Sequence, residues 1–174
     1  RDPRSNAQRI LGWDLPAGAI WQAVALVSVL AVLGLYATIL LGGGGLAGPF
    51  PPPLAMAGLQ IVAMVLLSAL MAGVGRAFGG TGQFVGALRI MVWLQALMIL
   101  MQVVQLVAMV LLPPLAGLVS LATLGAIGWI ASGLVAGLHG FKSQGMVLLG
   151  IIGTLLGVGF VLSILFLPFF PPAP

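Results

Sequence analysis

The sequence contains no cysteine and only two acidic residues. Without cysteine it can form no disulfide framework, no thiolate metal site and no dithiol redox centre. Both acidic residues, Asp2 and Asp14, precede the first long apolar run. The apolar part of the chain therefore holds no pair of carboxylates for acid–base catalysis. These absences predict a protein that is not an enzyme and that uses no metal and no other cofactor.

Charge of either sign is also scarce. Charged residues make up 5% of the 174 residues, and hydrophobic residues make up 61%. A soluble domain carries about a quarter charged residues, so lipid must be the solvent of a chain this apolar. The net charge of +4 comes from six scattered basic residues that form no basic stripe. We therefore expect membrane lipids and other membrane proteins, or further copies of the chain, as partners, and no nucleic acid.

Five apolar stretches are long enough to cross a bilayer as helices, which takes about 20 residues each. They lack the alternation of a barrel strand. The predicted fold class is an all-α integral membrane protein, a bundle of five transmembrane helices over residues 19–167. The expected spans are 19–41, 54–74, 88–112, 115–138 and 146–167, followed by a proline-rich tail at 168–174. Two adjacent prolines end the third span, which predicts a tight antiparallel hairpin with the fourth.

The basic residues predict how the bundle is oriented. They lie before the first span, between the second and third, and between the fourth and fifth: Arg1, Arg4, Arg9, Arg76, Arg89 and Lys142. These three segments share one side, and the positive-inside rule makes that side cytoplasmic. We expect a cytoplasmic N-terminus and an outside C-terminus. Arginine outnumbers lysine, and alanine, glycine, leucine and proline dominate, which indicates a bacterial protein of the cytoplasmic (inner) membrane.

Residues 1–18 form a short cytoplasmic segment with amphipathic character. Asp2 can cap a helix that starts at the proline after it. Ile10, Leu11 and Trp13 would then dip into the headgroup layer, while the neighbouring arginines face anionic lipid. The alternative is a frayed lead-in to the first span.

The stretch RAFGGTGQF, which begins at Arg76, raises the question of a nucleotide site. A phosphate-binding loop needs a strand, the pattern GxxxxGK[ST] and a helix. Here an apolar helix comes first, and Thr81 follows Gly80 with no lysine nearby. A dinucleotide-binding fingerprint needs a βαβ unit that a helical membrane protein lacks. We interpret the stretch as a cytoplasmic turn whose glycines supply positive φ angles, and we expect no nucleotide as a partner.

His139, the single histidine, lies at the end of the fourth span. No second metal ligand stands at a suitable spacing. As a catalytic base it would need a serine, but Ser132 lies about 10 Å earlier along the same helix, and Ser143 has no third group to orient the histidine. We interpret His139 as a helix-end residue at the lipid headgroups, where it suits the helix dipole, in preference to a ligand or a base.

Amides are the main polar groups at membrane depth. Gln95, Gln102 and Gln105 lie with three methionines within about 80° of the third span's circumference, at 100° per residue. Two interpretations remain open. The amides either bond to neighbouring helices, at about 0.6–2 kcal/mol per bond, or line a polar cavity together with the adaptable methionines.

Two helices carry small residues along one side. They are Gly125, Gly128 and Ser132 on the fourth span and Gly153 and Gly157, a GxxxG pair, on the fifth. Such stripes let two helix backbones approach closely. The sequence leaves open whether the stripes meet each other or a second protein.

The glycine loop also carries a resemblance to a known family. Gly79, Gly80, Gly82 and Phe84, in GGTGQF ahead of a third span with an early basic residue, resemble the Yip1 family. The lead-in DPRSNAQRIL, the five spans and the loop LHGFKSQGMVLL extend the resemblance over nearly the whole chain. Eukaryotic members act in vesicle trafficking and engage Rab-type GTPases, partly through a long cytoplasmic N-terminal region. Because this chain has only residues 1–18 there, the resemblance does not carry that partner over.

The resemblance and the composition together predict a non-enzymatic polytopic membrane protein like the short bacterial members of that family. It would act through protein or lipid interaction, as a membrane organiser, a trafficking-like scaffold or an accessory subunit of a membrane complex. The alternative is a small permease or channel-like transporter that uses the glutamine-lined face. No span has an ionisable residue in its interior, although such residues mark ion and proton pathways.

Overall fold

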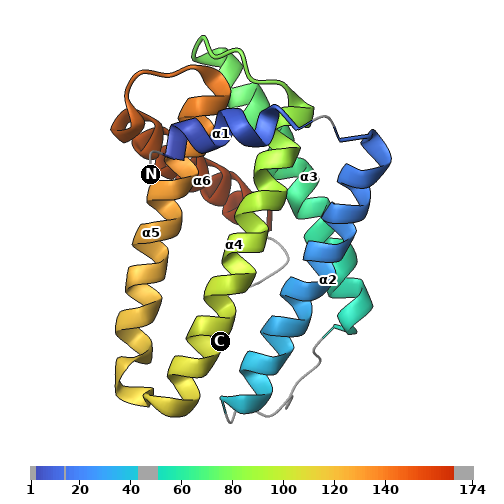
Figure 1. Cartoon of the computed structure of the whole chain (residues 1–174), viewed down its shortest axis with the longest axis vertical. Coiled ribbons are helices and arrows are strands. Elements are labelled where there is room, and N and C mark those ends of the chain that lie inside the picture. The colour runs from blue at the N-terminus through green and yellow to red at the C-terminus, as the bar shows by residue number, and fades with distance from the viewer. Residues whose placement is uncertain (1–2, 14, 43–50, 167–174) are drawn as a thin grey trace.

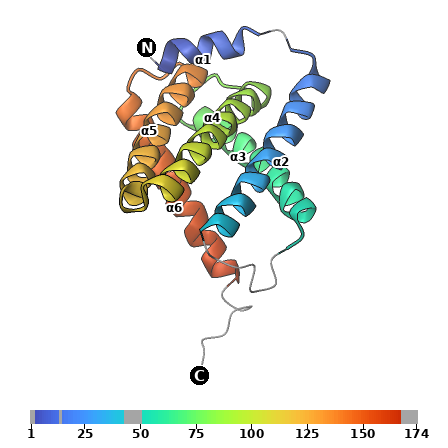
Figure 2. The same ribbon diagram turned by 60° about the horizontal axis from the view of Figure 1, so that its bottom comes forward.

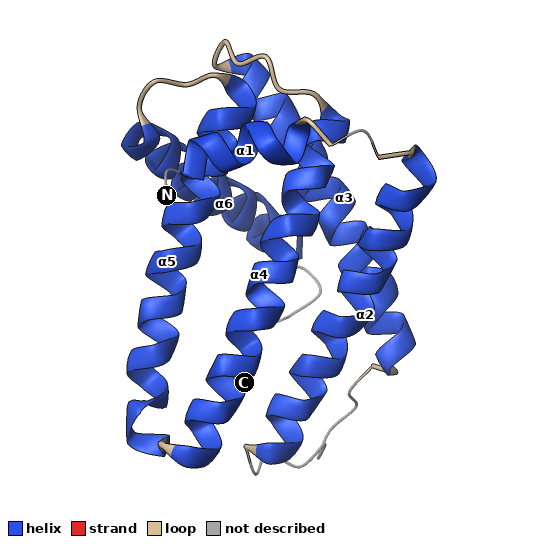
Figure 3. Ribbon diagram, viewed as in Figure 1, coloured by secondary structure: helices blue, strands red, loops and turns tan. Residues whose placement is uncertain are grey.

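The computed structural model describes residues 3–13, 15–42 and 51–166, which are helical except for short connections (Figures 1 and 3). The helices are α1 (Pro3–Leu11), α2 (Ala17–Leu41), α3 (Pro53–Ala77), α4 (Phe84–Leu111), α5 (Pro113–His139) and α6 (Gln144–Phe166). The expected all-α fold class is confirmed. The proposed Asp2 cap and the tail at 168–174 lie outside the described residues.

Five of these helices are long and apolar enough to cross a membrane, with 22 to 28 residues each. Their bounds follow the expected spans closely, and the largest shift is at α4, which begins at Phe84 instead of residue 88. The expected span began at Leu88, one residue before Arg89. A helix need not end where a charge marks the edge of the hydrocarbon, so α4 extends past Arg89 toward the preceding loop.

The expected tight hairpin between the third and fourth spans is present. α4 ends at Leu111, Leu112 is the single connecting residue, and α5 begins with Pro113 at its first position. Proline is favoured there because its missing N–H would have no partner in the first helical turn.

α4 is the central helix of the bundle, since it packs against α1, α2, α3 and α5. The short helix α1 lies across one end of the bundle, where it contacts α4 and α5 (Figures 1 and 2). By contrast α6 packs only against α5 among the described helices, and runs obliquely behind the bundle in Figure 1.

The basic side chains that the structure describes are Arg9, Arg76, Arg89 and Lys142. They belong to α1, to the end of α3, to the first turns of α4 and to the α5–α6 loop. These elements meet at the upper end of the bundle in Figure 1, which we call the basic end. The α4–α5 turn lies at the opposite end.

The packed core lies under α1. Its buried residues come from α1, α3, α4 and α5: Ala7, Ile10, Ala72, Ala87, Ile90, Leu94, Leu134 and Leu138. The expectation that Ile10 and Leu11 dip into the headgroup layer is therefore wrong. Ile10 is only 8% exposed and Leu11 packs on the same cluster. Protein contact displaces lipid there because the bundle end itself offers an apolar surface.

Large apolar side chains cover the outside of the bundle. Leu118 and Leu124 on α5, and Leu149, Leu156 and Phe160 on α6, are each more than 60% exposed. Lipid tails are as apolar as leucine, so a bilayer covers such surfaces without the cost that water would impose.

Candidate functional site: a histidine enclosed by the glycine loop

The loop between α3 and α4 folds over the end of α5 and encloses the side chain of His139, which is 3% exposed. A Cβ atom added to Gly75, Gly80 or Gly82 would lie closer than 3.0 Å to atoms of that histidine. Real Cβ atoms essentially never approach so closely. Glycine is required at these three positions because the histidine occupies the space of their side chains.

Three glycines lie between Arg76 and the start of α4, and the prediction that they supply positive φ angles is correct for Gly79 alone. Gly79 has φ of +83°, a conformation that other residues rarely adopt. Gly80 and Gly82 do not have positive φ angles. Glycine is needed at these two positions because His139 lies where a side chain would be.

Both ring nitrogens of His139 take part in hydrogen bonds. Nδ1 accepts the backbone N–H of Gly82 at 3.1 Å, and Nε2 lies 3.1 Å from the carbonyl oxygen of Met71. A backbone N–H only donates and a carbonyl only accepts, so the ring must be the neutral imidazole with its proton on Nε2. We call this arrangement, His139 with Met71, Gly75, Gly80 and Gly82, the histidine interlock.

Backbone contacts strengthen the same junction. The N–H of Thr81 donates to the carbonyl of His139 at 3.3 Å. Gly140 caps α5 with φ of +74°, and the next residue, Phe141, stacks on the imidazole with ring centres 5.4 Å apart. The interlock therefore joins the α3–α4 loop and the α5–α6 loop into one surface at the basic end.

The interlock leaves His139 no lone pair for a metal ion or a substrate proton, because Nδ1 already accepts a bond. The residue does end α5 as predicted, but its ring is buried in protein and does not face the headgroups. Sequence reasoning missed the pairing because Gly82 and His139 are 57 residues apart. One sequence contains no signal that links two such distant positions.

A second polar junction fastens the start of α6 to α5. The side-chain amide of Gln144 donates to the carbonyl of Trp129 at 2.8 Å and to Oγ of Ser132 at 3.3 Å. Ser132 itself donates to the Trp129 carbonyl at 2.8 Å and is fully buried. The sequence singled out Ser132 as a small residue for close packing but not Gln144.

The small-residue stripes meet only near this junction. A Cβ atom added to Gly128 would lie 3.8 Å from Cδ1 of Leu148 on α6, which is an ordinary van der Waals contact. Gly125 on α5, and Gly153 and Gly157 on α6, have nothing within 4 Å of that position. The two stripes therefore do not pack along their length within one copy of the chain.

The three glutamines of α4 contact three different helices. Gln95, 7% exposed, accepts a bond from the amide of Gln60 on α3 at 3.2 Å. Gln105 donates to the carbonyl of Ala116 on α5 at 3.1 Å. Gln102 fills the space beside Gly34 on α2, where a Cβ would lie closer than 3.0 Å to its amide. The amides thus do not converge on a single cavity.

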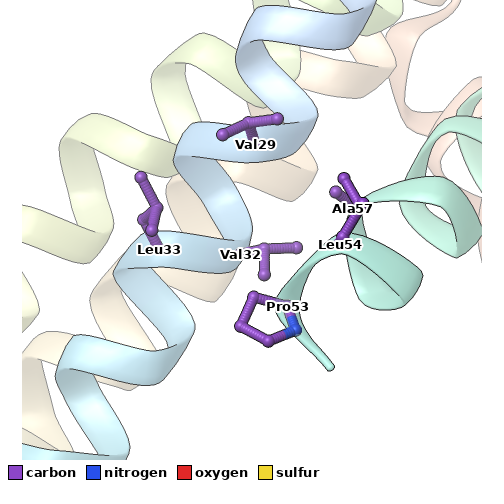
Figure 4. A pocket seen from close by; sticks show the side chains of 6 residues that line it. All are labelled: Val29, Val32, Leu33, Pro53, Leu54 and Ala57. Carbon is purple, nitrogen blue, oxygen red and sulfur yellow. The ribbon is translucent and has the colours of Figure 1, made fainter. Parts of the chain in front are cut away.

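An apolar groove of about 250 Å³ lies between α2 and α3 (Figure 4). Its lining side chains are Val29, Val32 and Leu33 of α2 and Pro53, Leu54 and Ala57 of α3. All six are apolar, so the groove offers a polar solute no hydrogen-bonding side chain.

Comparison with known proteins bears on the whole chain. A family model described as the Yip1 domain matches residues 1–166. The match includes the glycine loop, the interlocked histidine and all five long helices. Comparisons with curated proteins and with solved structures gave no match. Because the family model covers nearly the full length, the chain belongs to the Yip1 family.

Proposed function

We propose that this Yip1-family protein is a non-enzymatic membrane protein that acts by binding other proteins or lipids at its basic end. It would serve as a membrane organiser, a trafficking-like scaffold or an accessory subunit of a membrane complex. The observation that carries the proposal is the histidine interlock. It uses the loop that resembles the family's to fix the shape of a surface, and it engages both ring nitrogens of His139.

The surface fixed by the interlock has suitable contact groups. Phe78 follows α3 directly and is 77% exposed, and Arg76 and Lys142 are exposed beside the same two loops. Among the described residues, the side chain of Arg76 bonds within its own helix, to the carbonyl of Ala72 at 3.2 Å. Binding residues are often found on loops held by a rigid scaffold, and an exposed aromatic ring at the same end of the bundle as exposed cations suits an acidic protein segment or a membrane surface. We call Arg76, Phe78 and Lys142 the platform residues.

The same reasoning favours a bacterial inner membrane with the basic end in the cytoplasm. All described cations lie at that end, as the positive-inside rule requires of a cytoplasmic face.

The transporter alternative receives less support. A permeation path needs polar groups that face a common space, and the glutamines of α4 instead bond or pack against α2, α3 and α5. This arrangement supports the role of the amides as contacts between helices.

The test is photocrosslinking in native membranes, with a photoreactive amino acid at Phe78 or, as the control, at Leu118, which is 64% exposed and lies five residues into α5, toward the α4–α5 turn. We expect discrete protein adducts from Phe78 that disappear when Arg76 and Lys142 are changed to glutamine. Equal adducts from both positions would argue against the platform. A solute flux through reconstituted wild-type protein that Gln102→Leu abolishes would favour the transporter.

A further inference from the structure

Arg89 is the one described cation that is partly enclosed by the fold. One of its terminal nitrogens donates to the carbonyl of Leu11, at the end of α1, at 3.0 Å. Its Nε is buried and has no hydrogen-bond partner among the described residues. The two acidic residues of the chain, Asp2 and Asp14, are not among the described residues, so the structure describes no carboxylate side chain near Arg89. A buried donor without a partner is rare in folded proteins and points to an ion or solvent group that completes it.

Arg89 lines a hollow of about 40 Å³ between α1, α2 and α4. The other lining residues are Ile10, Trp13, Leu15, Ile20, Ala23, Val92 and Trp93. The hollow thus combines one cation, two indole rings and otherwise apolar walls. The rings of Trp13 and Trp93 lie 5.5 Å apart with their planes tilted by 60°, and both are partly exposed. The hollow exceeds the volume of about 10–15 Å³ that one water-sized group needs, so an oxygen of a phosphate group can enter it beside Arg89.

The depth of Arg89 matches the position of lipid phosphates. α4 has 28 residues, so it is about 42 Å long, and Arg89 lies about 7.5 Å from its start. The helix exceeds a hydrocarbon core of about 30 Å by about 12 Å. With that excess shared equally by the two ends, Arg89 lies near the boundary between headgroups and acyl chains, which is also where tryptophan is enriched.

We propose that this hollow binds the phosphate of an anionic phospholipid. The guanidinium of Arg89 donates to the non-ester oxygens, Trp13 and Trp93 flank the headgroup, and an acyl chain follows the apolar walls that α2 and α4 provide. Guanidinium groups favour phosphate because their forked donors match two oxygens at once. An anionic lipid is preferred over a zwitterionic one because its net negative charge offsets the charge of Arg89, whereas a zwitterionic headgroup brings a cation of its own.

This inference rests on the lipid form of the proposed function and names its ligand. It also gives α1 a role, because Arg89 holds the last turn of α1 through Leu11. Lipid bound at Arg89 would help to fix α1 on the bundle. The platform residues are not among those that line the hollow, so the two proposals can fail separately.

The test compares delipidated wild-type protein with Arg89→Gln, Arg89→Lys and the control Arg9→Gln, an exposed cation of the same end that belongs neither to the platform nor to the hollow. Native mass spectrometry would count bound phosphatidylglycerol, phosphatidylcholine and inorganic phosphate, each titrated alone. We expect phosphatidylglycerol to bind wild type at least about 10-fold more tightly than Arg89→Gln, with Arg89→Lys between them and Arg9→Gln like wild type. Unchanged binding by Arg89→Gln, equal binding of phosphatidylcholine, or equal loss in Arg9→Gln would overturn the site.

Inorganic phosphate serves to separate the two sources of the anion. If it saturates the protein as tightly as phosphatidylglycerol and displaces it, the hollow is an anion site and the lipid assignment is wrong. We expect phosphate alone to bind too weakly to displace the lipid, because it makes no contact with the apolar walls.

A second measurement does not depend on an Arg89 variant being folded. Trp21→Phe with Trp129→Phe leaves Trp13 and Trp93 as the only tryptophans. In phosphatidylcholine nanodiscs, a few per cent of phosphatidylglycerol with brominated acyl chains should quench this fluorescence more than the same fraction of brominated phosphatidylcholine. Equal quenching by the two lipids would contradict the proposal. If crosslinks from Phe78 persist in that case, the lipid site fails and the proposed function stands.

Discussion

Replacing Gly75 by alanine tests whether the histidine interlock holds the basic end together. The new Cβ would lie closer than 3.0 Å to three ring atoms of His139, namely Cε1, Nε2 and Nδ1. Gly73, two residues earlier on α3, is the matched control because nothing lies within 4 Å of its Cβ position. Both changes replace glycine by alanine near the end of one helix, so the difference in helix propensity, about 0.5–1 kcal/mol in favour of alanine, cancels between them.

The expected difference follows from the contacts of the ring. Overpacking of a well-packed site costs about 1–3 kcal/mol. A displaced ring also loses its bonds to Met71 and Gly82, at about 0.5–1.5 kcal/mol each. The smallest of these values add up to about 2 kcal/mol. Gly75→Ala should therefore be at least about 2 kcal/mol less stable than Gly73→Ala, which is about a 30-fold change in the folding equilibrium.

The assay is reversible unfolding in mixed micelles, followed by circular dichroism, and it should be repeated in a His139→Ala background. Removal of the ring frees the space that the new Cβ would enter, so Gly75→Ala and Gly73→Ala should then differ by no more than about 0.5 kcal/mol. Equal stability of the two variants in the wild-type background would refute the interlock. So would a difference that persists without the imidazole, because the clash would then lie elsewhere.

Three further predictions concern topology, the amides and nucleotides. Cysteines at Thr81 and Ser143 should react with a membrane-impermeant reagent only from the cytoplasm, and one at Ala47 only from outside; reaction of Thr81 and Ala47 from one side would contradict five spans. Gln95→Leu should lower the free energy of unfolding by about 1–3 kcal/mol because it leaves the Gln60 amide unpaired, whereas Gln60→Leu with Gln95→Leu should be nearly neutral; additive losses would argue against the pair. ATP and GTP at millimolar concentration should leave the melting temperature unchanged, since a bound nucleotide would raise it by mass action; a saturable increase would reopen the question of a nucleotide site at the glycine loop.

The sequence was sufficient to predict the helices and the hairpin, because those features depend on local composition. A run of about 20 apolar residues allows few structures in a bilayer, and two consecutive prolines allow few connections. Neither argument needs to know which helices are neighbours. The span limits shifted where a charge lay inside a helix, as at Arg89, since a membrane boundary and a helix boundary are set by different forces.

Contacts between distant segments were beyond such reasoning. Gly80 and Gly82 were correctly identified as parts of a turn, yet their partner lies at the end of α5 and only the fold brings it there. Likewise Ile10 and Leu11 were correctly identified as an apolar face of α1, but hydropathy does not distinguish lipid from protein as the surface that covers them. The glutamines of α4 illustrate the same limit, since their spacing located one face and gave no partner for any of them.

The separate position of α6 has a consequence for how the protein is made. Every described contact among α1 to α5 is formed by residues that precede Gln144, and α6 adds contacts to α5 alone. Domains fold from the N-terminus as the chain leaves the ribosome, at about 5–20 residues per second. The chain up to His139 therefore already contains both partners of the interlock and the whole core under α1. The last helix then enters the membrane beside a finished bundle, and Gln144 need only reach the Trp129 carbonyl and the Ser132 hydroxyl of one completed neighbour.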